Sequence, residues 1–131
     1  MYKIEKNGNV FYQTFSDFVS EQELTKWIEE SEKALAGVKG QKFYVFADLR
    51  KLKPLTPAAG QLMAKGQEMY RKSGMERSVV ILADAVTSMQ FVRLAKQSGI
   101  DAWERYIDAS TTPDFKEVGL EWLLNKKEPA K

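Results

Sequence analysis

The sequence contains no histidine and no cysteine. The absence of histidine excludes an imidazole base, a serine–histidine–aspartate triad and a histidine-ligated metal. The absence of cysteine excludes a thiol nucleophile, a disulfide, a thiolate zinc site and an iron–sulfur cluster. The glycine-rich phosphate-binding motifs of nucleotide sites are also missing. Because most familiar catalytic chemistry is removed, we expect a protein that is not an enzyme and uses no cofactor.

Long apolar runs are missing as well. No segment approaches the 18 or more apolar residues of a membrane helix, and residues 1–5 lack the apolar core of a signal peptide. The longest apolar runs, residues 43–47 and 79–83, have the length of strands. We therefore expect a cytoplasmic protein without a membrane span. A length of 131 residues fits one domain, which we place at 1–124, with a flexible tail at 125–131.

Charge is nearly balanced in total but unevenly distributed. The net charge of +2 is too small to indicate a nucleic-acid partner. Residues 17–32 hold six acidic residues and one lysine, whereas residues 38–77 hold nine basic and three acidic residues. Two interpretations remain open: solvated helix faces with a charged loop, or a bipolar surface that recognises a partner or a second copy of the chain.

Turn and capping signals divide the chain into short elements. Asn7-Gly8 lies between two alternating runs, which predicts a hairpin because both central residues of a type I′ turn need positive φ. Ser20 and Glu23 have the spacing of a capping box, and Gly37 ends the helix that follows. The dipeptides Thr56-Pro57 and Thr112-Pro113 predict two further helix starts, each with a capping threonine and a proline at the first helical position.

Helices and strands therefore alternate, in the order ββαβαβαβα. The strands at 43–49 and 78–82 are apolar at their centres on both faces, so helices must cover each face of the sheet. We predict an α/β fold with a four- to five-stranded, mixed and mostly parallel sheet. The expected strands are 2–6, 9–16, 43–49, 78–82 and 105–108; the helices are those capped by Ser20, Thr56, Asp84 and Thr112; a basic loop spans 50–55.

Five motifs in this order carry a resemblance to a known family. They are VFADLR at 45–50, PLTP at 54–57, RSVVI at 77–81, RLAK at 93–96 and EVGLEWL at 117–123. Over residues 2–124 the chain resembles the STAS domain, the sulfate transporter and anti-sigma-factor antagonist family, and more closely its SpoIIAA-like branch of small stand-alone bacterial proteins. The resemblance implies a non-catalytic regulatory or protein-interaction role.

The resemblance also implies a regulatory position. Anti-sigma-factor antagonists carry a serine or threonine at the N-terminus of the helix after the third strand, where a partner kinase phosphorylates it and switches binding. The matching residue here is Thr56, although the family's Asp-Ser-Ser-Gly-type signature is absent. Thr56 is equally the expected N-cap of its helix. The residues predicted to bind a protein partner are Arg50, Lys51, Lys53, Thr56, Met89 and Phe91.

Two other interpretations of the sequence remain open. The chain could instead carry or sense a small apolar ligand or a nucleotide, held by Trp27, Phe46 or Trp103 between helices and sheet. Asp48, Asp84 and Asp108 each follow a predicted strand, and their carboxylates could gather at one sheet edge around a hard cation. They have no ligand-spacing motif, so we predict no metal site.

Overall fold

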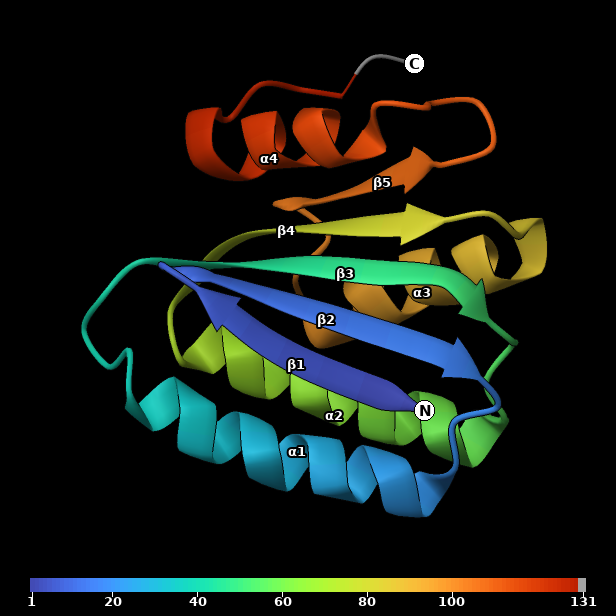
Figure 1. Cartoon of the computed structure of the whole chain (residues 1–131). Helices are drawn as coiled ribbons and strands as arrows, with labels where there is room; N and C mark the ends of the chain where they lie inside the picture. The colour runs from blue at the N-terminus through green and yellow to red at the C-terminus, as the bar shows by residue number, and fades with distance from the viewer. Residues whose placement is uncertain (130–131) are drawn as a thin grey trace.

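The computed structural model describes residues 1–129 and has the predicted element order (Figure 1). The elements are β1 (Tyr2–Asn7), β2 (Val10–Asp17), α1 (Glu21–Ala36), β3 (Phe43–Leu52), α2 (Pro57–Lys72), β4 (Met75–Leu82), α3 (Ala85–Ser98), β5 (Glu104–Asp108) and α4 (Phe115–Asn125). The five strands form one sheet in the order β1-β2-β3-β4-β5. No helix within residues 1–129 is long and apolar enough to cross a membrane.

The sheet is mixed, as predicted. β1 and β2 form an antiparallel hairpin with Asn7 paired to Val10, and Gly8 in its turn has a φ of 63°. The pairs β2–β3, β3–β4 and β4–β5 are all parallel. The carboxyl ends of these four strands consequently lie at the same edge of the sheet, where α/β proteins commonly place binding groups.

Helices cover both faces, and two cores result. α1, α2 and α3 pack on one face, and α4 lies alone on the other (Figure 1). The first core includes Leu24, Met63 and Phe91 from these three helices. The second core is smaller and surrounds Trp122 of α4. The double burial of β3 and β4 explains why their centres are apolar on both faces.

The predicted helix caps are largely present. Ser20 Oγ accepts a hydrogen bond from the Glu23 amide at 3.1 Å, and Glu23 accepts one from the Ser20 amide at 3.3 Å. Thr56 caps α2 through the Ala59 amide at 3.2 Å. Gly99 ends α3 with a φ of 82°, a left-handed conformation that glycine adopts without strain.

Three boundaries differ from the prediction by two residues or more. β3 continues to Leu52, so residues 50–52 of the predicted basic loop are strand; the continuation of β2 through Ser16 and Asp17 supplies their partners after a register shift. β4 begins at Met75 because Phe43 pairs with it. α4 begins after Asp114 rather than after Thr112, because the Thr112 carbonyl accepts from the Phe115 amide in a turn.

Residues 125–129 of the predicted tail lie within the described structure. Asn125 ends α4, and Glu128 accepts two hydrogen bonds from the Arg105 guanidinium at 2.7 and 2.9 Å. Residues 130–131 of the predicted tail lie outside the described residues.

Candidate functional site

Exposed apolar side chains gather near the carboxyl edge of the sheet. Phe18, directly after β2, is 72% exposed, and Val86 and Met89 in the first turns of α3 are 56% and 64% exposed. The Lys53 ammonium lies 6.0 Å from the centroid of the Phe18 ring. We call Phe18, Lys53, Val86 and Met89 the carboxyl-edge surface. Apolar side chains exposed beside charged ones are typical of interaction sites.

Hydrogen bonds hold the backbone around this surface in place. The Lys53 amide donates to the Asp17 carbonyl at 3.0 Å, which joins the ends of β2 and β3. Gln90 on α3 accepts from the Leu55 amide at 2.8 Å and donates to the Leu55 carbonyl at 2.9 Å. This amide side chain thereby satisfies both backbone groups of Leu55 and fixes the β3–α2 loop against α3. A surface held in this way loses little conformational entropy on binding.

The basic residues predicted at this loop do not form one cluster, since Arg50 and Lys53 have different neighbours. Arg50 makes two hydrogen bonds to the Asp48 carboxylate at 2.9 and 2.8 Å, and its guanidinium lies 4.6 Å from the Phe115 ring centroid on the α4 side. Although burial favours the neutral carboxyl, hydrogen bonds from Arg50 hold the pKa of Asp48 below its ordinary value. Lys51 is exposed, and of the three residues only Lys53 contacts Phe18.

The other predicted partner-binding residues divide between surface and core. Met89 is exposed, whereas Phe91 is 2% exposed and packs in the first core. Phe91 can therefore influence a partner only by supporting α3. Thr56 is exposed and lines a groove of about 310 Å³ between α2 and α3. The basic residue that shares this groove with Thr56 is Arg93, rather than Arg50, Lys51 or Lys53.

The three strand-end aspartates do not gather. Asp48 is bound to Arg50, Asp84 caps α3 through the Thr87 amide at 2.8 Å, and Asp108 accepts from Ser110 at 2.6 Å. Within residues 1–129 no group of three or more acidic side chains is placed to hold a metal ion.

The aromatic residues of the ligand-carrier alternative do not share one cavity. Trp27 lines an internal cavity of about 40 Å³ on the side of α1–α3. Phe46 belongs to the core on the opposite face of the sheet, and Trp103 packs against both cores. A volume of 40 Å³ has room for water. Sites for small-molecule ligands usually occupy about 300–1,000 Å³.

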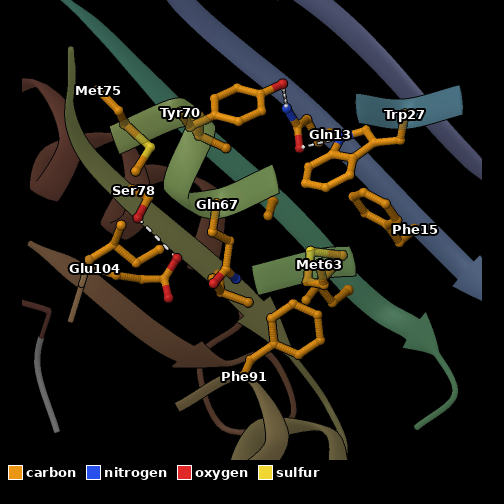
Figure 2. A pocket seen from close by; sticks show the side chains of 15 residues that line it. Gln13, Phe15, Trp27, Met63, Gln67, Tyr70, Met75, Ser78, Phe91 and Glu104 are labelled. Carbon is orange, nitrogen blue, oxygen red and sulfur yellow. Dashed lines mark hydrogen bonds between the residues drawn. The ribbon is translucent and has the colours of Figure 1, made fainter. Parts of the chain in front are cut away.

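Buried polar side chains surround this cavity (Figure 2). Gln13 donates from Nε2 to the Tyr70 hydroxyl at 2.6 Å and accepts from Trp27 Nε1 at 3.3 Å. Tyr70 in turn donates to Ser31 Oγ at 2.7 Å, and its burial raises the pKa of its hydroxyl to about 12. This chain of hydrogen bonds joins β2, α1 and α2 through the middle of the core.

A buried carboxyl lines the same cavity. Glu104, the first residue of β5, is 5% exposed. Its Oε1 accepts from Ser78 Oγ at 3.0 Å, as Figure 2 shows, and its Oε2 lies 2.7 Å from the Tyr106 hydroxyl. Burial raises the pKa of Glu104 to about 7, and the hydrogen bonds from Tyr106 and Ser78 oppose that rise only in part.

Comparison with known proteins rests on structure, since the sequence matches no protein-family model and no curated protein. An uncharacterized protein of the DUF3478 family with a SpoIIAA-like fold, from Shewanella loihica PV-4, superimposes with a TM-score of 0.64. The match covers 94% of this chain and 92% of that one, at 20% sequence identity. The chain has a SpoIIAA-like fold.

The anti-sigma factor antagonist SpoIIAA in its unphosphorylated form is also similar. Its TM-score is 0.56 at 10% identity, over 89% of this chain and 96% of that one. The expected α/β architecture is thus confirmed. In this SpoIIAA-like fold both the carboxyl-edge surface and the buried carboxyl adjoin α3. Met89 of the carboxyl-edge surface lies on this helix. The buried carboxyl reaches the helix through the Tyr106 hydroxyl, which lies 3.3 Å from the Phe91 carbonyl.

Sequence reasoning missed the buried polar cluster. Gln13 offered a signal, because it stands between Phe11 and Phe15 on the inward face of an alternating strand. Glu104 offered a weaker signal, since it lies at the start of a strand, where an acidic residue is usually exposed. Neither pattern revealed the distant partners, which are Tyr70, 57 residues from Gln13, and Ser78, 26 residues from Glu104.

Proposed function

We propose that this chain is a non-catalytic regulatory domain that binds another protein through its carboxyl-edge surface. The observation that carries the proposal is the exposure of Phe18, Val86 and Met89 around a loop that Gln90 fixes in place. The likeness in fold to an anti-sigma factor antagonist supports a regulatory role. A core of apolar contacts with a charged rim is typical of protein interfaces.

The charges beside the surface favour a particular partner. Lys51 and Lys53 are exposed at the end of β3, and neither forms an ion pair within residues 1–129. A partner with an apolar centre and an acidic rim would therefore match the surface in hydropathy and in charge.

Site-specific photocrosslinking tests this proposal. A photoreactive phenylalanine analogue replaces Met89 in one variant and Leu124, exposed on α4, in the control. In extracts of the source cells we expect one dominant protein adduct from position 89 that position 124 does not give. Equal adduct patterns at the two positions would rule out the carboxyl-edge surface.

Charge reversal separates the surface from net charge. The variant Lys51→Glu/Lys53→Glu should abolish the adduct from position 89. Its matched control, Lys39→Glu/Lys42→Glu, changes the net charge equally at the amino edge of the sheet, where both lysines are exposed. We expect the control to retain the adduct. Loss in both variants, or in neither, would contradict the proposed charge complementarity.

A second copy of the chain is the other occupant that this experiment distinguishes. An adduct of twice the chain mass, together with concentration-dependent sedimentation that Met89→Ser removes, would identify a homodimer. A heterologous adduct from a monomeric chain would instead identify a separate partner.

We also propose Thr56 as the regulatory position of this domain. It is exposed at the start of α2 and shares a groove with Arg93, which would attract a phosphate. Thr56→Asp adds negative charge and Thr56→Asn is its neutral counterpart; both side chains can replace the N-cap. We expect only Thr56→Asp to alter the yield of the position-89 adduct, and phosphopeptide mapping of the native protein to find Thr56 modified. An unmodified Thr56 with equal adduct yields would refute this assignment.

A further inference from the structure

Glu104 is an ionisable side chain in a core that otherwise holds neutral groups. It is the one acidic or basic side chain among the buried residues of the described chain, and it forms no ion pair there. Burial of an unpaired carboxylate is energetically unfavourable, because the charge loses its hydration. A glutamine or an apolar residue would avoid this cost, so the presence of a carboxyl calls for a physical explanation.

The surroundings of Glu104 offer no compensating cation within residues 1–129. Arg77 on β4 and Arg105 on β5 point to the opposite face of the sheet, where their guanidinium carbons lie 5.9 and 4.1 Å from the centroid of the Trp122 ring. Tyr70 of α2, across the cavity, is already bonded to Gln13 and Ser31. The charged groups of the other adjoining elements, all at the surface, are Lys65, Glu68, Arg71 and Lys72 on α2, Arg93 and Lys96 on α3, Glu76 on β4 and Asp101 before β5.

The hydrogen bonds of Glu104 depend on its protonation state, because Tyr106 has a single hydroxyl proton. The Tyr106 oxygen lies 2.7 Å from Glu104 Oε2 and 3.3 Å from the carbonyl oxygen of Phe91 on α3. When Glu104 is ionised, the tyrosine proton is held by the carboxylate, and the Phe91 carbonyl receives no proton from Tyr106. When Glu104 carries a proton, its own O–H can donate to the Tyr106 oxygen. The tyrosine proton is then free to bond Phe91.

We propose that Glu104 is a proton-operated switch, in which uptake of one proton from solvent reverses this relay and fastens β5 to α3 through Tyr106. Ser78 donates to the other carboxyl oxygen in both states. The raised pKa of Glu104, about 7, places the change near neutral pH. The switch is a property of the isolated chain; its effect on a partner at Met89 rests on the proposed function.

The neighbouring cavity has room to solvate the ionised state. Glu104 lines this space of about 40 Å³ together with Ser78, Gln67 and Phe91 (Figure 2). A cavity of that size can admit water, and a water molecule beside the carboxylate would lower the cost of its ionisation. The group can therefore change its charge while the fold stays intact.

Carbon-13 NMR of the isolated full chain, titrated from about pH 5 to about pH 9, tests the switch directly. We expect the Glu104 side-chain carboxyl carbon to titrate near 7 and the amides of residues 91–95 to shift with the same midpoint. Tyr106→Phe should leave Glu104 titrating but remove the response of α3. Glu104→Gln should remove both, whereas Glu117→Gln, which deletes an exposed carboxylate on α4, should remove neither.

Several results would overturn the switch. The first is a titration midpoint for the Glu104 carboxyl at its ordinary pKa of 4.5. The second is the absence of any chemical-shift change in the amides of residues 91–95 during the titration. The third is an α3 response that stays unchanged in Tyr106→Phe. If Glu104→Gln fails to fold, Tyr106→Phe still decides the outcome. Photocrosslinking from position 89 at about pH 6 and about pH 8 then tests the consequence for binding separately. If the adduct yield is the same at both pH values although Glu104 titrates as expected, the link to the partner is refuted and the switch itself is retained.

Discussion

Two glycines on α2 should respond to alanine in opposite directions. Gly66 lies against the indole of Trp27 on α1, and a methyl group at this position would stand well inside van der Waals contact with Cζ3 and Cη2 of that ring. The indole cannot easily retreat, because it donates to Gln13 and packs between Phe15 and Tyr70 at centroid distances of 5.5 and 5.9 Å.

Gly60 provides the matched control within the same helix. A methyl group there would have Leu94 Cδ2 as its nearest neighbour, at 3.9 Å, which is ordinary contact. Glycine to alanine in a helix interior gains about 1 kcal/mol from propensity alone. Gly60→Ala should therefore raise the free energy of unfolding by up to about 1 kcal/mol.

Gly66→Ala receives the same propensity gain but also overpacks the core. Overpacking typically costs about 1–3 kcal/mol, and displacement of the indole would weaken its hydrogen bond to Gln13 by about a further 1 kcal/mol. We expect a net loss of about 1–3 kcal/mol in the free energy of unfolding. The two alanine variants thus differ in sign, although they carry the same chemical change on one helix.

Urea unfolding followed by circular dichroism measures both effects, and thermal unfolding should shift by a few degrees in each direction. Trp27→Leu should itself be destabilising, but in that background Gly66→Ala should cost less than in the wild type, because the shorter side chain relieves the clash. A Gly66→Ala variant as stable as the wild type, or an equal cost of Gly66→Ala in the wild-type and Trp27→Leu backgrounds, would refute the steric argument.

Three further changes have expected outcomes. Between pH 4.5 and about 7, Glu104 keeps its proton in the folded chain and loses it in the unfolded chain. The free energy of unfolding should therefore fall as pH rises, by about 3 kcal/mol in total. In urea unfolding Glu104→Gln should flatten this pH dependence, and an unchanged dependence would contradict the assignment. Thr56→Ala should cost about 1 kcal/mol by loss of its N-cap, and Thr56→Ser should restore most of it in the same assay. Gly119→Ala should cost about 1–3 kcal/mol in thermal unfolding, because its methyl group would meet Phe46 Cε2 at 2.7 Å; a neutral effect would show that α4 can shift on the sheet.

The features that the sequence predicted correctly are mostly local ones. The Asn7-Gly8 turn and the Ser20 capping box depend on residues within four positions of one another, so their patterns are complete in the sequence. The extension of β3 to Leu52 depends instead on pairing with Asp17, 35 positions earlier. The misplaced strand boundaries are therefore the ones that a partner strand sets.

The candidate site divides in a similar way. Met89 and Phe91 were both predicted to bind a partner, but the structure exposes Met89 and buries Phe91 in the first core. Arg50 points toward Phe115 on the α4 side, near the point where the pairing of β3 with β2 shifts register. Such a shift cannot be read from the composition of the segment. The bond between Gln13 and Tyr70 joins residues on different elements, so it became visible only once the helices were placed on the sheet.

Two departures from ordinary burial converge on α3. Its first turns expose Val86 and Met89 to solvent, while the Phe91 carbonyl faces a tyrosine that serves a buried carboxyl. Each departure lowers stability, since apolar groups are left in water and an ionisable group is removed from it. Sequences that fold consistently tend to break local rules where function requires it. The two departures lie on one helix, so a change in the core has a short path to the surface: from Glu104 through Tyr106 to the Phe91 carbonyl, and two residues along the chain to Met89.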